Sequence, residues 1–247
     1  MGKNRLKTVK AGRLVCAVCY SQATASDGKA ERQAKTKLSS AARQRLNFRA
    51  AWQRLELILA ANFDRRDWWV TLTYDDAHLP PDRQAAQKEL GKYFRALRGQ
   101  ARRAGAEIKY AYATEEMPDE PGGSKRLHHH FALTRAGLDV ETVRTVWRRG
   151  GVHIEPLLDG PNDSYEARAR YLIKERHPGA LGRKTGLRGW SGSRNLAQPE
   201  ITSELVPDTV TVAAPPGAFI LDRHGEQNCY GSYVYIKYLL PEPRRRT

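Results

Sequence analysis

The sequence predicts an α+β fold in which helices flank a central, mainly antiparallel sheet. Segments typical of strands alternate with segments typical of helices, in the order strand, helix, strand, loop, strand, helix, strand, helix. The second and third of these strands are joined by a loop short enough for an antiparallel pair. Helices between the other strands can cover one face of the sheet, which gives a layered α+β arrangement.

Composition limits the kind of protein and the kind of partner. The 247 residues suit one large domain or one domain with arms, and 40% hydrophobic residues are enough for a core. Lys and Arg number 42 against 27 acidic residues, which gives a formal charge of +15. Such a charge favours a polyanionic partner, most often nucleic acid, over a merely soluble basic protein.

The N-terminal region, residues 1–62, predicts a basic arm followed by a helix. The first 45 residues are polar and broken by Gly and Ser, with one short strand at most, at RLVCAVC. Residues 41–61 carry apolar side chains at helical spacing. The apolar face of that helix is expected to contain Leu46, Trp52, Leu55 and Leu59.

The first strand and the longest helix follow. Residues 68–74, WWVTLTY, are aromatic and β-branched and precede a DD and PP turn, which predicts a strand. Residues 83–104 predict a helix that ends at Gly105. Its apolar stripe consists of Leu90, Phe94, Leu97 and Ala101. Residues 107–116, EIKYAYATEE, predict the second strand.

The third strand is expected at RLHHHFAL, residues 126–133. A helix over 139–149 stops at a glycine pair, and a fourth strand follows at 151–158. The last predicted helix covers 163–176, with the Asn-Asp pair at 162–163 as candidate N-cap.

The predicted main domain covers 63–240. Within it, 178–216 is rich in Gly, Pro, Ser and Arg and predicts a loop insertion. The type of the last element, within NCYGSYVYIKYLL, stays open, and residues 241–247 form a basic tail.

Cysteine usage and hydropathy favour a cytoplasmic protein. Cys16 and Cys19 form one C-x-x-C, and Cys229 stands apart, so neither a zinc site nor a disulfide framework is indicated. No run of 18 apolar residues is present, and the basic N-terminus lacks the apolar core of a signal peptide.

Three consecutive histidines suggest a metal site. In a strand, His128 and His130 share one face, about 6–7 Å apart, and His129 takes the other. A carboxylate on the neighbouring strand would complete an open three-ligand site. Alternation allows one of Glu115 and Glu116 to face the pair; we favour Glu115. Mg²⁺ or Mn²⁺ suits such a site when water and phosphate fill the open positions, and zinc remains an alternative.

The helix at 163–176 offers a nucleophile. Tyr171 and Lys174 are three residues apart and therefore share a helix face. The lysine and a metal ion would both stabilise a phenolate, which could attack a phosphodiester. The rival tyrosines are Tyr165, which has no lysine at this offset, and Tyr235 and Tyr238, which are better explained by packing.

In order along the chain, WVTLTY, HHH and ARYLIKE resemble the three motifs of rolling-circle replication initiators of the HUH endonuclease superfamily. The similarity is to replication proteins of plasmids and of phages with small circular single-stranded DNA. GWSGSRNL and GSYVYIKYLL are also similar to segments of such proteins, and the resemblance spans roughly residues 65–240.

The resemblance assigns roles by position. It implies that His128 and His130 bind the metal, that Tyr171 is the single nucleophile with Lys174 as its partner, and that Glu115 is an extra ligand. The strand at 71–73 matches the first motif, whose role is mostly structural or facing DNA. The middle position of this motif usually carries a bulky apolar residue, but here it is His129. Either His129 packs on the other sheet face, or His129 and another residue form the ligand pair.

The resemblance also implies a fold and an activity. The fold is a five-stranded antiparallel sheet flanked by helices, like an RNA-recognition module. The activity is metal-assisted nicking of single-stranded origin DNA through a covalent 5′-phosphotyrosine, followed by rejoining. No Walker motif is present, so a helicase and a polymerase of the bacterial host would be needed as partners.

Basic and aromatic residues could hold the DNA strand. The candidate contacts are Arg183, Lys184, Arg188 and Arg194. Trp190 could stack on bases, whereas Trp68 and Trp69 are better explained as core. Three alternative functions stay open: a single-tyrosine transposase or relaxase, a non-catalytic DNA-binding protein of the same fold, and a metal-dependent hydrolase that uses water.

Overall fold

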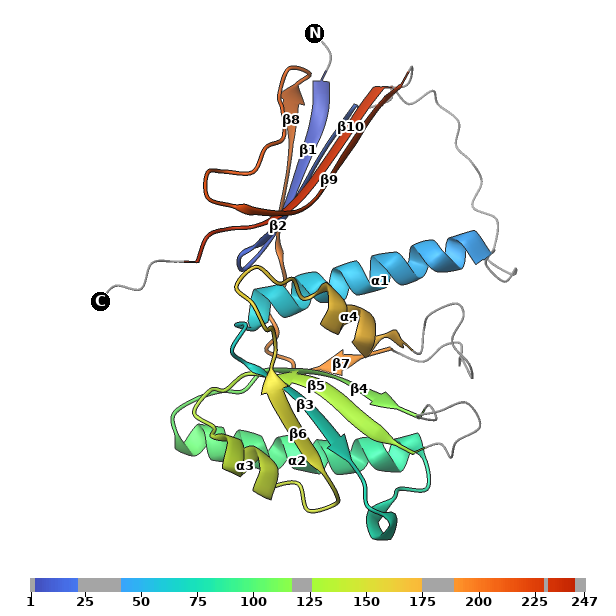
Figure 1. Ribbon diagram of the computed structural model, residues 1–247, viewed down its shortest axis with the longest axis vertical. Helices are drawn as coiled ribbons and strands as arrows, with labels where there is room; N and C mark the ends of the chain where they lie inside the picture. The colour runs from blue at the N-terminus through green and yellow to red at the C-terminus, as the bar shows by residue number, and fades with distance from the viewer. Residues whose placement is uncertain (1–2, 22–40, 117–125, 175–188, 229–230, 243–247) are drawn as a thin grey trace. The chain divides into compact units, whose positions relative to one another are not determined.

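The computed structural model shows an α+β protein with two five-stranded antiparallel sheets (Figure 1), which confirms the predicted fold class. The structure describes residues 3–21, 41–116, 126–174, 189–228 and 231–242. The chain forms two compact units. Unit 1 comprises residues 1–44 and 198–247, and unit 2 comprises residues 45–197.

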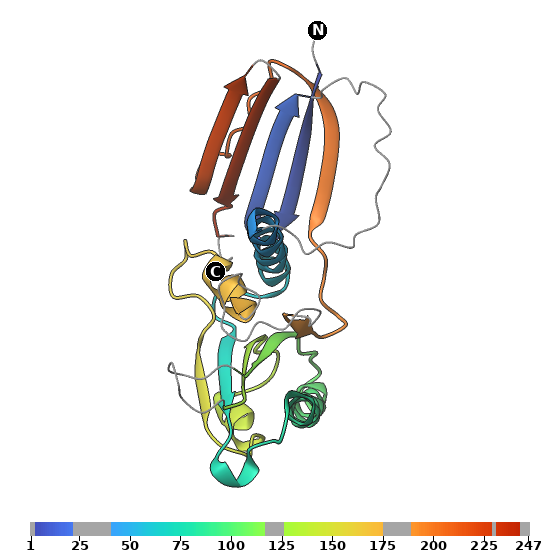
Figure 2. The ribbon, with the colours of Figure 1, turned by 90° about the vertical axis from the view of Figure 1, so that its right-hand side faces the viewer.

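Unit 1 joins the two ends of the chain in one sheet. Its strands are β1 (Lys3–Ala11), β2 (Leu14–Ser21), β8 (Glu200–Pro207), β9 (Phe219–Asn228) and β10 (Gly231–Leu239). Figure 2 shows them side by side in the order β8-β1-β2-β10-β9. The N-terminal hairpin therefore pairs on both sides with strands that lie far away in the sequence, from Lys10 with Glu200 to Leu14 with Leu239.

This division differs from the predicted boundaries. The N-terminal residues expected to form an arm instead supply two strands, and β8 lies inside the region 178–216 expected to be a loop. Pairing with strands so distant in sequence leaves no local signal, which is why the arm could not be recognised as part of a sheet. The element of open type near the C-terminus is strand β10.

The C-x-x-C lies within strand β2. Cys16 pairs with Lys237, and Cys19 pairs with Val234. Because Cys19 comes three positions after Cys16, an odd offset in a strand, their side chains project from opposite faces of the sheet. The two thiols therefore lie on different sides of β2.

Unit 2 contains the second sheet, in the order β6-β3-β5-β4-β7. Its strands are β3 (Trp68–Thr73), β4 (Tyr110–Glu115), β5 (His128–Leu133), β6 (Val152–Pro156) and β7 (Ser191–Gly192). The first four lie within or at the predicted strands. β5 occupies the centre of the sheet between β3 and β4.

The helices of unit 2 cover both faces of this sheet. They are α1 (Ala41–Asn62, which begins in unit 1), α2 (Arg83–Arg103), α3 (Val140–Thr145) and α4 (Glu166–Leu172), with a short 3₁₀ turn at Asp76–His78. Figure 1 shows α2 and α3 on one face and α4 on the other. In the described part of the chain, no helix is both long enough and apolar enough to span a membrane.

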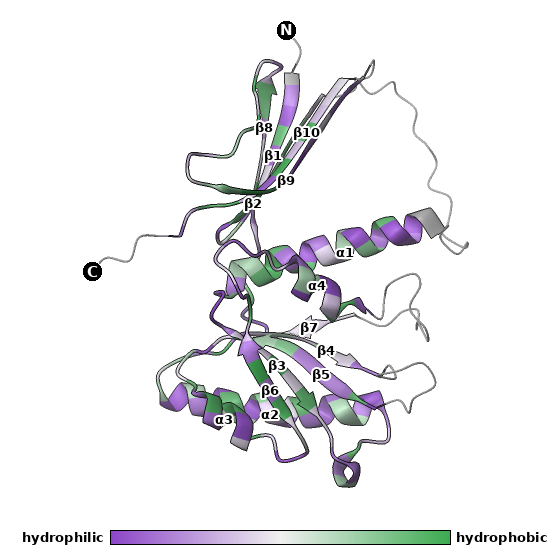
Figure 3. Ribbon diagram, viewed as in Figure 1, coloured by the Kyte–Doolittle hydropathy of each residue, from purple (hydrophilic) through white to green (hydrophobic). Residues whose placement is uncertain are grey.

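The main core lies between the sheet and α2. The predicted stripe of α2 is buried as expected, and Phe131 of β5 is fully buried against it. Figure 3 shows the alternation of hydrophobic and hydrophilic residues along α2. On α1, Leu55 and Leu59 are buried, but Leu46 is 66% exposed, so the predicted apolar face of α1 is wrong at that position.

The ends of α2 follow their local sequence. The carboxylate of Asp82 accepts a hydrogen bond from the backbone N–H of Ala85, and Gly105 takes a positive φ of 70° just past the helix. The start of α4 does not follow the prediction. Its N-cap position is Tyr165, and Asp163 accepts instead from the N–H of Gly160 in the preceding turn.

Truncating the core should destabilise unit 2. The substitution Leu97→Ala removes a fully buried side chain, and we expect the free energy of unfolding to fall by about 2–5 kcal/mol. The matched control is Leu46→Ala on the exposed side of α1, which should change it by no more than about 0.5 kcal/mol. Urea denaturation measures both, and equal losses would contradict the described core.

Candidate metal and nucleophile site

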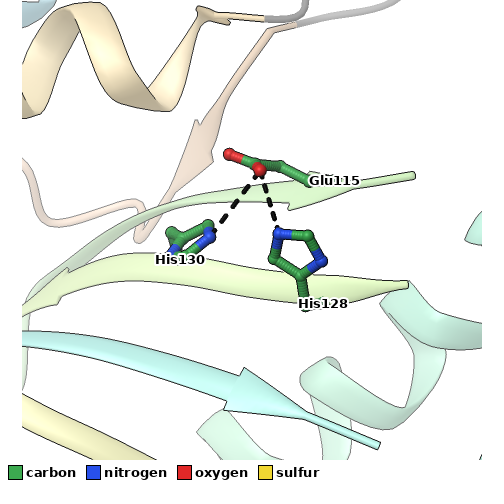
Figure 4. A group of neighbouring side chains, drawn as sticks. All are labelled: Glu115, His128 and His130. Carbon is green, nitrogen blue, oxygen red and sulfur yellow. Dashed lines mark hydrogen bonds and ion pairs between the residues drawn. The ribbon is translucent and has the colours of Figure 1, made fainter. Parts of the chain in front are cut away.

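The strand register brings two histidines and a glutamate to one sheet face. Glu115 of β4 pairs directly with His128 of β5, and His130 pairs with Ala113 of β4 and Thr71 of β3. Directly paired residues share a face, and alternate residues of one strand share a face. Figure 4 shows the carboxylate above the two imidazole rings.

The three side chains converge on one carboxylate oxygen. Oε2 of Glu115 lies 3.0 Å from Nε2 of His128 and 3.6 Å from Nε2 of His130. One ligand atom from each of the three residues lies within 4.8 Å of the others. Glu115 is 1% exposed and His130 is 5% exposed, so the group lies in a largely dry setting.

Both rings are oriented through their other nitrogen. Nδ1 of His128 donates to the backbone carbonyl of Arg126 at 3.1 Å, and Nδ1 of His130 lies 2.9 Å from Oγ1 of Thr71. These contacts leave Nε2 of each ring facing Glu115. Fixing one imidazole nitrogen so that the other presents its lone pair is how proteins usually position histidine ligands.

Burial and contacts with Glu115 set the pKa values at the site. Burial acts to raise the pKa of Glu115, but hydrogen bonds with His128 and Lys174 outweigh it and hold the pKa below its usual value. Burial acts to lower the pKa of His128, yet its hydrogen bond with Glu115 leaves that pKa raised. Burial lowers the pKa of His130 to about 4, so its ring is neutral near pH 7.

This arrangement fits a divalent ion. Two ligand atoms about 2.1 Å from one ion lie about 3.0 Å apart at a right angle and about 3.4 Å apart at the tetrahedral angle. The observed oxygen–nitrogen separations of 3.0 and 3.6 Å are close to these values. Oε1 of Glu115 is buried without a hydrogen-bond partner among the described residues, so it too is available to a cation. Glu115, His128 and His130 thus form a group that could hold a metal ion, with coordination positions left for water or phosphate.

Tyr171 lies directly beside this group. Its hydroxyl lies 3.1 Å from Nε2 of His130, and the two rings meet edge to face with centroids 4.7 Å apart. The side chain is 37% exposed, so solvent or a ligand can reach it. The helix α4 carries Tyr171 over the same sheet face that presents the imidazoles.

Lys174 contacts both Tyr171 and Glu115. Its Nζ lies 2.6 Å from Oε2 of Glu115 and 3.9 Å from the centre of the Tyr171 ring. Burial acts to lower the pKa of Lys174, but the hydrogen bond with Glu115 leaves it raised, so the ammonium keeps its charge. The five residues predicted as metal ligands or as the catalytic pair therefore form one cluster.

Trp69 supports the cluster from β3. Its ring stacks near His130 with centroids 6.0 Å apart, meets Tyr171 edge to face at 5.8 Å, and lies 4.8 Å from the guanidinium of Arg168. The sequence indicated core packing for Trp69, and burial confirms it, but its contacts with the site were not predicted. The alternation of β3 was the available signal, since Trp69 shares a face with Thr71, and Thr71 pairs directly with His130 on that face.

His129 lies on the opposite sheet face and is fully buried. Its Nε2 lies 2.8 Å from the hydroxyl of Tyr74, and its Nδ1 lies 3.0 Å from the hydroxyl of Thr114. Burial lowers the pKa of His129 to about 3, so the ring stays neutral. This placement selects the first of the two alternatives for His129, packing on the other face, and keeps His128 and His130 as the pair.

The four predicted DNA contacts either lie outside the described residues or lie away from this site. Arg183, Lys184 and Arg188 lie outside the described residues. Arg194 is exposed and lines a pocket with Arg98 and Arg102 at the far end of β4 from Glu115.

Residues 67–176 match the family model described as replication-associated protein ORF2/G2P. The matched segment runs from β3 to just beyond α4 and so contains Glu115, both site histidines, Tyr171 and Lys174. The chain is thus similar to replication-associated proteins in the segment that carries the site. No curated protein and no solved structure matches the chain.

Folding stability should depend on His129 below neutral pH. The unfolded chain takes up a proton on this ring below about pH 6.5, whereas the folded chain keeps it neutral down to about pH 3. The associated stabilisation is therefore present above pH 6.5 and falls by about 2 kcal/mol at pH 5. Urea denaturation at pH 7 and pH 5 should show this loss in the wild type and a smaller loss in His129→Gln. Equal losses would contradict the assignment.

Metal binding should separate the two candidate glutamates. Glu115→Gln keeps the shape of the side chain but removes its charge, and we expect Mn²⁺ affinity to fall at least about tenfold. Glu116→Gln is the matched control and should leave the affinity within about twofold. Isothermal titration calorimetry measures both, and an equal effect of the two variants would rule out Glu115 as the specific ligand.

Proposed function

We propose that this protein is a replication initiator that nicks single-stranded DNA by tyrosine transesterification, as in the HUH endonuclease superfamily. The observation that carries the proposal is the Tyr171 hydroxyl 3.1 Å from His130, within the histidine and glutamate cluster. A nucleophile and a candidate metal group on one sheet face are the parts that such a reaction needs. The family match over the same segment supports a role in replication.

The reaction exchanges one phosphate ester for another. The phenolic oxygen of Tyr171 forms a bond to phosphorus while the bond between phosphorus and the 3′ oxygen breaks. The phenolic proton leaves to solvent, and the 3′ oxygen gains a proton to become a free hydroxyl. The 5′ end stays linked to the protein, and the reverse reaction rejoins the strand without an external energy source.

Glu115, His128 and His130 would hold the divalent ion, for which Mg²⁺ and Mn²⁺ are the proposed choices. When bound, such an ion polarises the scissile phosphate and offsets the charge that develops on it. Nε2 of His130 has one lone pair and accepts one partner at a time. The Tyr171 hydroxyl would therefore leave that nitrogen when an ion binds there, and would be free to contact the substrate.

Lys174 has two roles in this proposal. Its ammonium neutralises Glu115 in the structure as it stands and lies over the Tyr171 ring. The same charge lies close enough to Tyr171 to contact a bound phosphate. The DNA must be unpaired at the cut, because a helix-borne phenol needs an exposed phosphate.

The proposal extends to the setting of the reaction. Nicking would take place at a replication origin of a phage or plasmid, in the bacterial cytoplasm, with a host helicase and polymerase extending the free 3′ end. Single-tyrosine transposases and relaxases share the chemistry and differ in the DNA they recognise.

Covalent capture tests the reaction. We expect the wild type with Mn²⁺ to form a denaturant-resistant adduct with 3′-labelled single-stranded hairpins of randomised loop sequence. The adduct should disappear in EDTA and in Tyr171→Phe, while DNA affinity stays within about twofold. Tyr165→Phe is the matched control, because Tyr165 is buried and its hydroxyl donates to the backbone of Phe63; it should retain the adduct.

Three outcomes would contradict the proposal. An adduct formed by Tyr171→Phe would place the nucleophile elsewhere. Cleavage by that variant without an adduct would indicate hydrolysis by water. A wild type that binds these DNAs in Mn²⁺ but never cleaves them would indicate a non-catalytic DNA-binding protein.

A further inference from the structure

The sheet of unit 1 has two unlike faces. On one face, Ala17, Cys19 and Ile236 are buried together with Val212, which belongs to the segment between β8 and β9. The other face carries the alternate residues of the same strands, and those toward the N-terminal end of β10 remain partly or largely exposed. One side of the sheet is therefore packed, and part of the other is open.

The open part carries a cluster of flat rings, here called the aromatic face. Its members are Tyr20, His224, Tyr233 and Tyr235. Tyr233 pairs directly with Tyr20, and Tyr235 pairs directly with His224, so all four rings share one side. His224 lies 4.9 Å from Tyr235 and 5.8 Å from Tyr233 between ring centroids, with interplanar angles of 34° and 29°.

Two of these rings are too exposed to solvent to belong to a hydrophobic core. Tyr233 is 39% exposed, and the side chain of His224 is 44% exposed. Further along β10, Lys237 and Leu239 on the same side are buried. The exposed rings thus form a compact patch at one end of the sheet rather than a continuous apolar surface.

Basic side chains border the aromatic face on one side. Arg5 pairs with Tyr20, and Lys7 pairs with Val18, which in turn pairs with Tyr235. Arg5 also donates to Oγ of Ser203, which holds its guanidinium at this edge. Glu226 of the outer strand β9 pairs with Tyr233, on the opposite side of the rings from Arg5 and Lys7.

This arrangement matches one class of ligand. Single-stranded nucleic acid is held by aromatic rings that stack on bases and by cations that follow the phosphates. A phosphate backbone over β1 and β2 would lie near Arg5 and Lys7 and away from Glu226, with its bases directed over the rings. The overall charge of +15 favours the same polyanion.

We propose that the aromatic face of unit 1 binds single-stranded DNA, as a second contact surface separate from the Tyr171 site. The similarity to replication-associated proteins selects DNA over RNA. The surface would hold a strand without cutting it, so the proposal does not depend on the transesterification.

Fluorescence anisotropy with a labelled 20-mer of thymidine tests this proposal on the full chain in EDTA, where cleavage plays no part. We expect Tyr233→Ala combined with His224→Ala to weaken binding about tenfold. Tyr233→Phe combined with His224→Phe keeps flat rings and should bind within about twofold of wild type. Arg5→Gln with Lys7→Gln should reduce the slope of log affinity against log salt by about 1.4.

The outcomes are distinct. Unchanged affinity in the alanine variant, with the fold retained by circular dichroism, would overturn the proposal, and so would tighter binding of a 20-mer of uridine. Loss of a dimer in sedimentation with unchanged DNA binding would assign the face to a second copy of the chain and overturn it too. A failure of adduct formation at Tyr171 would leave all these results unaffected.

Discussion

The buried carboxylate of Glu115 is the group on which the site depends. It lies at the end of β4 with almost no exposure, and one of its oxygens contacts His128, His130 and Lys174. A buried carboxylate destabilises the fold unless a partner offsets its charge. The negative charge that would bind an ion therefore also holds the three partner side chains in place. The geometry of the cluster is therefore a consequence of satisfying one negative charge.

Strand alternation places the three histidines on two different faces of the sheet. His129 points into the layer below the sheet, where two hydroxyl groups satisfy both of its ring nitrogens. His128 and His130 point to the other side and meet Glu115 and α4. His129 thus lies in the core, and its two neighbours lie with Glu115 in the candidate metal site.

Local signals predicted most of unit 2. The helix at 83–103 begins at an aspartate cap and ends at a glycine, both of which act within a few residues, and its buried stripe follows from helical spacing. The start of α4 was predicted wrongly because Asp163 satisfies a turn instead of the helix. Unit 1 was not predicted, because its sheet joins strands from the two ends of the chain.

The sequence by itself determined which residue types are present and which side of a strand or helix each one takes. That was enough to place His128 with His130, Tyr171 with Lys174, and His129 apart from its neighbours. Only the tertiary structure decided that Glu115 rather than Glu116 faces the imidazoles, and that α4 brings its tyrosine onto this face. Alternation fixes the side of a residue within its own strand, whereas register and helix docking come from packing between distant segments.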